Sequence, residues 1–472
     1  MTARTQMDRR TFISYASAGV ATAVAPLVLP SRVCMAGPDA PSNKLNVSLI
    51  GCGGRGADIL GEAIGLGVNV IALCDADVTR IANTRKLLIE RRPEARAALE
   101  RATGYEDYRT LLEKEKSLDG VLIAIGAWWH APMSAAFMKA GKHVYCEKPL
   151  TRLVSEAREL GNLARASKVA TQMGTQGVGG EAFRRSVEIV QSGLLGVIRE
   201  VHVWNNHNSL RPPSHDRPPG EDPVPAGFNW DLFVGPSPLR PFKRDTYYPG
   251  TTTTSVWFDF GAGLLGDFGV HTWQLPIRAL KLDYPVRVEH NVPEPVKETY
   301  ASSVKSRYDF AARGDRGPVT VWYCDTIHHP PQEATADLEA TYGKVPTLGA
   351  MLLGDKGTLY AGGWGGGNLM KLKGEAKMRG VSDHPAAKSL PVTEPRAPQQ
   401  NHMLEWIEAA KGGPKTYQPF EVAAHSMEVM LPGIVALRMQ RPIDWDGANM
   451  KVPGAPEADK FIHADYRRKW LI

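Results

Sequence analysis

The sequence predicts an α/β protein that begins with a doubly wound parallel sheet and continues with an α+β domain built on a large, mostly antiparallel open sheet. Up to residue 147, apolar runs of strand length alternate with stretches of helical periodicity, a pattern typical of parallel sheets. Beyond residue 280, runs with period-two hydrophobicity follow one another with few helices between them. We expect domains over 44–168 and 169–472, after a separate segment over 1–36.

The expected strands of the first domain lie at 45–50, 68–74, 118–125 and 142–147, with an apolar helix over 131–140. The last of these strands ends on Glu147, Lys148 and Pro149. Ligands of doubly wound sheets bind at the carboxyl edge, where these residues stand, and a φ-locked proline fixes the direction of the chain beside the lysine. Lys148 is therefore the first candidate for chemistry.

A glycine-rich loop follows the first strand and precedes a helix-forming stretch. Its residues are Gly51, Cys52, Gly53, Gly54, Arg55 and Gly56, which fit GxGxxG in the strand-turn-helix setting that the motif requires. Gly51 permits the tight turn, Gly53 lets a pyrophosphate approach the backbone, and Gly56 allows close packing of the helix. The loop predicts a dinucleotide at the N-terminus of the helix.

Asp75 ends the second expected strand, 24 residues after Gly51 and near the spacing of a ribose-binding carboxylate. A carboxylate there accepts hydrogen bonds from ribose hydroxyls and repels a 2′-phosphate, so NAD is favoured over NADP. Two alternatives stay open. Arg80 could still reach a phosphate, and Asp75 could instead be a helix N-cap.

The stretch of the second domain that most clearly indicates chemistry is 257–271, in which glycines precede a helical run. Asp267 and His271 are four residues apart and would share one helix face. Oxidation of a carbinol requires removal of the hydroxyl proton, a task that suits a histidine oriented by a carboxylate. A structural pair is the alternative. A metal site is not expected, because His328 and His329 form the only other dense histidine site and no third ligand is evident.

Taken together, these motifs resemble the Gfo/Idh/MocA family of oxidoreductases, named for glucose–fructose oxidoreductase and inositol dehydrogenase. The matching elements are the loop at 51–56, Trp-His-Ala-Pro at 129–132, the run 140–150 with Glu-Lys-Pro, and 261–271, which fits GGGxLxDxGxH with alanine at 262. The resemblance covers nearly everything after residue 44 and implies a Rossmann domain. It implies that Lys148 lies beside the nicotinamide and the substrate hydroxyl, that Asp267 binds substrate, and that His271 is the general acid/base.

The same resemblance suggests further site residues. Trp129, His130 and Glu147 join the loop residues as cofactor-binding candidates, and Gln176, Trp204, Asn206 and His207 as candidates for lining a sugar pocket. Residues of these types, taken alone, are more often packing or surface residues than pocket residues. The family often has Thr-Pro where this chain has Gly-Ala-Trp-Trp at 126–129, so Trp128 either packs on the nicotinamide ribose or fills core.

The N-terminal segment resembles a twin-arginine export signal, with Arg9 and Arg10 before a weakly hydrophobic run over 12–29. An uncleaved membrane anchor is the alternative, although Pro26 interrupts the run. This route carries folded proteins, which would allow the nucleotide to be loaded before export to the periplasm. Residues 1–36 hold half of the net charge of +6, and no basic stripe remains beyond them, so nucleic acid is not an expected partner.

The leading functional prediction is an exported NAD-dependent oxidoreductase that acts on a sugar or cyclitol, with the twin-arginine machinery as its export partner. The alternative is a redox-neutral glycosidase that oxidises, eliminates and reduces again with NAD. Relatives of that kind replace Asp-x-Gly-x-His by a tyrosine–histidine arrangement, which this chain lacks. A third class is a catalytically silent sugar-binding protein. We also expect a homo-oligomer formed through the second sheet.

Overall fold

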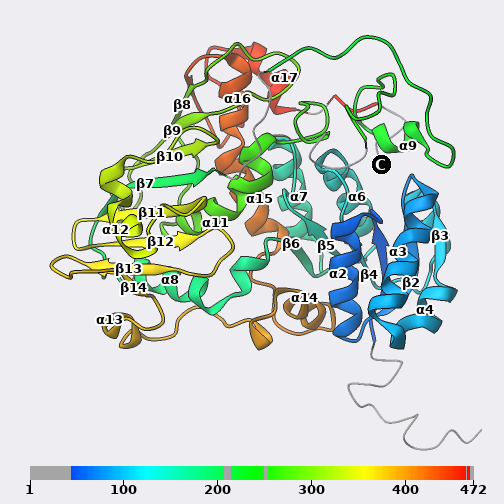
Figure 1. Cartoon of the computed structure of the whole chain (residues 1–472), viewed down its shortest axis with the longest axis horizontal. Coiled ribbons are helices and arrows are strands. Elements are labelled where there is room, and N and C mark those ends of the chain that lie inside the picture. Colours follow the sequence, from blue (N-terminus) through cyan, green and yellow to red (C-terminus); the bar gives the residue numbers. More distant parts are fainter. Residues whose placement is uncertain (1–43, 207–213, 249–253, 464, 468–472) are drawn as a thin grey trace, which may run out of the picture. The chain divides into compact units, whose positions relative to one another are not determined.

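The computed structural model describes residues 44–206, 214–248, 254–463 and 465–467. The expected export signal and His207 lie outside these ranges. Residues from Leu45 onward form one compact unit, shown in Figure 1.

The first sheet is parallel throughout and has the strand order β3-β2-β1-β4-β5-β6. Its strands are β1 (Asn46–Ile50), β2 (Asn69–Cys74), β3 (Thr103–Tyr105), β4 (Gly120–Ile123), β5 (His143–Glu147) and β6 (Thr171–Gly174). They read as continuous apolar runs because helices cover both faces of the sheet. The expected doubly wound sheet is confirmed. β6 carries it a few residues past 168, where we expected the domain to end.

The helices of this part are α2 (Gly54–Gly65), α3 (Val78–Arg91), α4 (Arg96–Arg101), α5 (Tyr108–Lys114), α6 (Ala127–Lys139) and α7 (Val154–Ala166). Aspartates begin two of them: Asp77 caps α3 by accepting from the Thr79 amide, and Asp107 caps α5 in the same way. α6 begins at Ala127 rather than 131, so the tryptophan pair lies inside its first turn.

The second sheet has nine strands in the order β14-β13-β12-β11-β7-β10-β9-β8-β15. They are β7 (Ile198–Asn205), β8 (Arg287–Asn291), β9 (Lys305–Phe310), β10 (Val319–Asp325), β11 (Leu348–Gly354), β12 (Gly357–Gly362), β13 (Leu369–Leu372), β14 (Arg379–Gly380) and β15 (Ile443–Asp444). Among these described strands only β7 and β10 pair in parallel. The expected mostly antiparallel sheet is therefore confirmed.

The remaining helices are α8 (Glu181–Gln191), α9 (Trp230–Val234), α11 (Val270–Ala279), α12 (Gln332–Tyr342), α13 (Pro385–Lys388), α14 (His402–Ala410), α15 (Phe420–Met430), α16 (Pro432–Met439) and α17 (Asp459–Ile462). Helices α7, α11 and α15 lie between the two sheets (Figure 1). α14 returns to the first sheet, where Met403, Trp406 and Ile407 pack into its core. The late part of the chain thus helps to build the nucleotide-binding half.

One helical stretch of the described residues, Phe420–Met439, is long and apolar enough to cross a membrane. In this structure 83% of its most apolar window is buried inside the molecule. This burial is what a core helix requires, and it accounts for the apolar composition.

Candidate active site

The glycine loop connects β1 to α2, and its three motif glycines have the expected local geometry. Gly51 has a φ of +92°, and a Cβ there would lie 2.2 Å from the Ala124 carbonyl oxygen. A Cβ on Gly56 would lie 1.9 Å from the Gly51 carbonyl oxygen, whereas one on Gly53 would meet only the Arg80 side chain, at 3.6 Å. The turn and the helix packing therefore demand glycine, and the backbone at Gly53 is open to a ligand.

Asp75 stands directly after β2 and faces the loop. Its carboxylate accepts the Cys52 amide at 2.8 Å and the Asp77 amide at 2.9 Å. Burial raises the pKa of Asp75, and these two amides act in the opposite direction. The helix N-cap is Asp77 and not Asp75, so the alternative reading of Asp75 is wrong. Its carboxylate is fixed at the cavity wall, where a ribose would bind.

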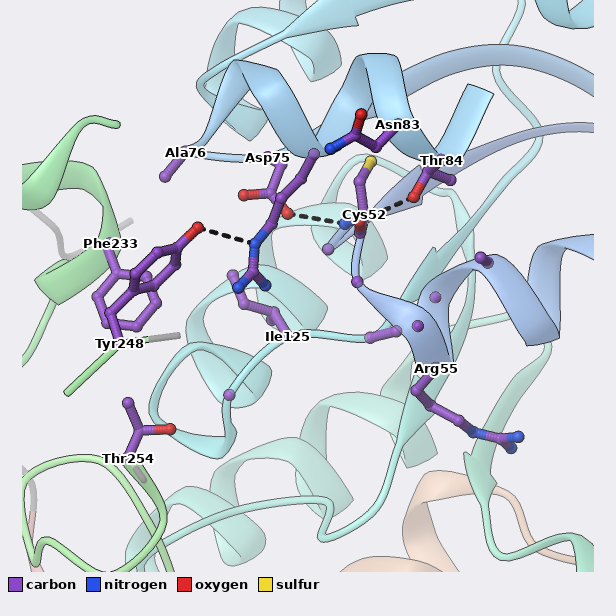
Figure 2. A pocket seen from close by; sticks show the side chains of 18 of the residues that line it. Cys52, Arg55, Asp75, Ala76, Asn83, Thr84, Ile125, Phe233, Tyr248 and Thr254 are labelled. Carbon is purple, nitrogen blue, oxygen red and sulfur yellow. Dashed lines mark hydrogen bonds between the residues drawn. The ribbon is translucent and has the colours of Figure 1, made fainter. Parts of the chain in front are cut away.

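A cavity of about 520 Å³ extends from the glycine loop to a wall contributed by the second half of the chain. Figure 2 shows Phe233 and Tyr248 on the opposite side of the cavity from Cys52 and Thr84. Tyr248 accepts a hydrogen bond from Arg80 Nε at 3.0 Å and also contacts the Asp77 carboxylate. Arg80 is thereby held against Tyr248 and beside the Asp77 carboxylate, so its guanidinium is less available to bind the 2′-phosphate of NADP. This arrangement favours NAD over NADP.

The segment that supplies this wall is anchored to the first domain by backbone hydrogen bonds. The Val78 amide donates to the Gly227 carbonyl at 3.0 Å, and the Asn229 amide donates to the Ala76 carbonyl at 2.8 Å. Trp128 lines the cavity, and its Nε1 donates to the Phe233 carbonyl at 2.9 Å. Trp128 is therefore part of the cofactor wall as well as of the core.

Glu147, at the end of β5, is buried and ion-paired. Arg55 donates from Nε and a terminal nitrogen to one Glu147 oxygen at 2.9 and 2.7 Å, and Gln176 Nε2 donates to the same oxygen at 3.0 Å. Figure 2 shows Arg55 pointing away from the other labelled side chains of the cavity. Arg55, Glu147 and Gln176 thus form one polar group beside Lys148.

Lys148 joins the two halves of the site. Its Nζ donates to the Asp267 carbonyl oxygen at 2.7 Å and lies 5.2 Å from the centre of the Phe268 ring. Asp267 and Phe268 belong to a π-helical segment, Leu265–Gly269, that runs directly into α11. Such segments are rare and occur at functional sites. The Glu-Lys-Pro strand end and the Asp-x-Gly-x-His motif therefore meet in space.

His271 is the second residue of α11 and follows Asp267 by one turn. Its Nε2 is buried and has no hydrogen-bond partner among the described residues. Burial lowers the pKa of His271 well below its usual range, and the nearby charges of Lys148 and Arg55 act in the same direction. A neutral imidazole with a free, buried nitrogen has the properties of a proton acceptor. Among the described residues, no three histidine, cysteine or acidic side chains gather as a metal site.

Two of the cofactor-binding candidates, His130 and Trp129, have structural partners instead of a place at the cavity. His130 bonds the carbonyls of Ile125 and Pro149 through its two ring nitrogens, so it braces the strand end that carries Lys148. Trp129 is buried against Tyr108 and donates to the Leu232 and Phe233 carbonyls.

Trp204 and Asn206 are likewise not brought to the site. Trp204 is fully buried in a separate cluster, where it stacks on Tyr360. Asn206 donates from Nδ2 to the carbonyls of Thr326 and His328 and so fixes a turn.

The motifs in the sequence did not indicate Phe233, Tyr248 or Trp364. Phe233 and Tyr248 line the cavity, and the ring centre of Trp364 lies 4.8 Å from that of His271.

A glycine loop, a carboxylate beyond the second strand and a cavity between them define a dinucleotide-binding protein of the doubly wound class. Residues 45–175 match the Gfo/Idh/MocA family model, described as an oxidoreductase family with an NAD-binding Rossmann fold. This part of the chain is thus an NAD-binding Gfo/Idh/MocA domain, as the motifs predicted. The glycine loop, Asp75 and the cavity fit that cofactor.

Curated relatives match less than half of this chain. Glycosyl hydrolase family 109 protein 2 of Shewanella sp. (strain ANA-3) is 28% identical over 202 residues, which are 40% of this chain and 44% of that protein. A dTDP-3,4-didehydro-2,6-dideoxy-alpha-D-glucose 3-reductase of Streptomyces violaceoruber is 33% identical over 108 residues, 22% of this chain and 31% of the reductase. The chain thus spans less than half the length of these relatives.

The fold extends over more of the chain than these matches do. A levoglucosan dehydrogenase, solved with NADH and L-sorbose, superposes with a TM-score of 0.56 at 15% identity and covers 85% of this chain and 98% of its own. At that identity the likeness concerns the fold alone. Both sheets of the present chain therefore have a counterpart among solved oxidoreductases.

Proposed function

We propose that this chain is an exported NAD-dependent oxidoreductase that transfers a hydride between a hydroxyl-bearing carbon of a sugar or cyclitol and a tightly held nicotinamide cofactor. The observation that carries the proposal is the 2.7 Å contact of Lys148 Nζ with the Asp267 carbonyl. This contact brings the cation of the NAD-binding domain to the segment that carries His271.

The residues divide the proton chemistry between them. His271 Nε2 accepts the hydroxyl proton of the substrate, since its lowered pKa keeps the ring neutral at physiological pH. Lys148 donates a hydrogen bond to the same oxygen and favours its deprotonation, and Asp267 orients a neighbouring hydroxyl. When bound, NAD accepts the hydride from the carbinol carbon, leaving a ketone or lactone. The reverse reaction returns both the hydride and the proton.

The test begins with protein purified without added nucleotide. Denaturation should release NAD or NADH, because the cavity is lined by the glycine loop on one side and by Phe233 and Tyr248 of the second domain on the other. Cofactor-loaded protein is then mixed with sugars, cyclitols and glycosides, and nicotinamide absorbance is followed. Reduction by one member of the panel supports the proposal. Release of NADP(H) would contradict the assignment of Asp75, and absence of reduction by the whole panel would contradict the activity.

A redox-neutral glycosidase is the second candidate, favoured by the similarity to glycosyl hydrolase family 109 proteins. Its net reaction is hydrolysis, so the nicotinamide returns to its starting state after each turnover. Aryl glycosides separate the two candidates. Catalytic release of p-nitrophenol with no accumulated nicotinamide reduction favours the glycosidase, whereas one reduced nicotinamide per oxidised sugar and no free p-nitrophenol favours the dehydrogenase.

Export by the twin-arginine route is part of the proposal and rests on Arg9 and Arg10 in the sequence. Replacing both by lysine should retain folded, cofactor-loaded precursor in the cytoplasm, detected by fractionation and nucleotide assay. Continued export of that variant would contradict the proposed route.

We also propose that copies of the chain associate through the second sheet. Trp322 on β10 lies among Lys305 and Arg307 of β9, which leaves an aromatic, polar face suited to pairing. Light scattering should give a mass above 51.5 kDa for the full chain, and Trp322→Glu should reduce it. A monomeric wild type would contradict this association.

A further inference from the structure

A large, exposed aromatic side chain packs against His271 in the proposed reaction site. Trp364 lies in the loop between β12 and β13 and is 56% exposed. Its ring centre is 4.8 Å from that of His271 and 6.3 Å from that of Phe268, whose own ring lies under Lys148 Nζ. The indole thus contacts both sides of the proposed acid–base machinery and still presents much of its surface to solvent.

The loop that carries this indole is held in place by close backbone packing. A Cβ on Gly177 would lie 2.6 Å from the Trp364 carbonyl oxygen, and a Cβ on Gly365 would lie 2.1 Å from the Gly177 carbonyl oxygen. Gly365 also has a φ of +79°. Glycine on both sides lets the two backbones touch, which fixes the start of the loop's turn. The loop therefore has a defined position relative to Gln176, which bonds Glu147 beside Lys148.

A buried asparagine secures the other end of the loop. Asn368 accepts the Gly362 amide at 3.0 Å and donates to the Ala182 carbonyl and to the Ser186 hydroxyl of α8. Its side chain is almost wholly buried. The loop is thus anchored at both ends, and the exposed indole is held at the site by these contacts.

We infer that Trp364 is a sugar-stacking platform that binds a second sugar ring of the substrate, so that the preferred substrate is a glycoside longer than a monosaccharide. This inference rests on the proposed function and refines its substrate class. The indole lies against His271, where the reacting hydroxyl would bind, and more than half of its surface is left exposed to solvent. A ring stacked there is one position removed from the reacting ring.

The chemistry of an indole suits this role. Sugar rings present an apolar C–H face and a hydroxyl-bearing rim, so stacking buries the apolar face while the hydroxyls stay hydrated. An aromatic ring gains free energy from such burial and from its quadrupole. A residue that served only to cover His271 would need no such exposed surface, and its removal would affect every substrate equally.

The experiment compares matched monosaccharide and disaccharide pairs on the cofactor-loaded full chain. The pairs are glucose with cellobiose, glucose with maltose, galactose with lactose, and N-acetylglucosamine with chitobiose. Calorimetric titration gives the dissociation constants for wild type, Trp364→Ala and Trp364→Phe. Val392→Ala serves as the control, because Val392 is an exposed apolar side chain in the segment that follows α13. Nicotinamide absorbance is recorded in the same samples.

The inference predicts that wild type binds one disaccharide more tightly than its monosaccharide, and that Trp364→Ala weakens disaccharide binding roughly tenfold or more. Trp364→Phe should recover part of the loss, and monosaccharide binding should change little. Equal weakening of both members of a pair, an unchanged Trp364→Ala variant, or no disaccharide preference in wild type would overturn the inference. Failure of the proposed oxidoreductase function is separate, since it appears as unchanged nicotinamide absorbance in wild type whatever the binding data show.

Discussion

Replacement of Asp75 by asparagine tests the structural basis of NAD selection. The carboxylate accepts the amides of Cys52 at 2.8 Å and Asp77 at 2.9 Å, one on each oxygen. Asparagine has the same shape but only one acceptor oxygen, so one of these amides would face an NH₂ group. The variant should therefore lose about 1–3 kcal/mol of stability from the unpaired donor.

The effect on the cofactor follows from the same charge. A hydrogen bond to a charged acceptor contributes about 1.5–3 kcal/mol, so loss of one ribose contact should raise the Kd for NAD by roughly 10- to 150-fold. Removal of the negative charge also ends the repulsion of a 2′-phosphate. The preference for NAD over NADP should therefore fall together with NAD affinity.

Fluorescence titration of refolded, nucleotide-free protein with NADH and NADPH measures both quantities. Asp107→Asn is the matched control, since Asp107 caps α5 after the neighbouring strand and lies outside the cavity lining. Asparagine can still cap α5, so that variant should keep its stability and show no change in cofactor preference. If Asp75→Asn keeps the wild-type Kd for NADH and the wild-type preference, Asp75 is not the ribose ligand and the argument is refuted.

Three further predictions concern titration and buried charge. Because burial and nearby cations lower the pKa of His271, kcat/KM for oxidation should decline only well below pH 6.5 or so. Arg55→Gln removes one of these cations and should move the decline to higher pH. If the pH profile of that variant does not move, another group is responsible for the decline. Burial lowers the pKa of His402 to about 4, so as the pH falls below about 6.5 the unfolded chain takes up a proton there and the folded chain does not. The free energy of unfolding should therefore fall by about 1.4 kcal/mol for each pH unit on going from pH 6.5 or so down to about 4. His402→Gln should make the urea midpoint of unfolding less dependent on pH across that range. Glu405→Ala would leave the fully buried Arg184 without its 2.9 Å partner and should lower the free energy of unfolding, measured in urea, by about 3–5 kcal/mol. An Arg184→Met/Glu405→Leu double variant should recover this stability. A loss under 1 kcal/mol or so in Glu405→Ala would show that the ion pair is solvated.

Local motifs predicted the nucleotide half of the site because their geometry is encoded within a few residues. The glycine loop, Asp75 and Lys148 all stand at the carboxyl edge of one parallel sheet, so naming the strands was enough to bring them together. The match of residues 45–175 to an NAD-binding Rossmann family confirmed the fold and the cofactor of this domain, and the roles of the single residues stay predictions.

The opposite wall could not be predicted, because its residues come from distant segments. Phe233 and Tyr248 reach the cavity, and Trp364 reaches His271, only through long-range packing, and none of the three belongs to a motif that signals a ligand. Period-two alternation separates the side chains of a strand into two faces but does not tell which face points toward the site. Trp204 alternates correctly along β7 but lies on the face that packs against Tyr360. The π-helical turn at Asp267 likewise has no signature in composition.

The most direct test of the account is single-turnover hydride transfer in His271→Ala, measured with the sugar that reduces the wild-type cofactor. The variant should retain the wild-type amount of bound NAD, because His271 does not line the dinucleotide cavity. Nicotinamide reduction should be about 10²–10⁴-fold slower, with the deficit shrinking as pH rises and hydroxide takes over the proton. Reduction at a rate near that of the wild type, with full cofactor occupancy, would contradict the assignment of His271 as the base.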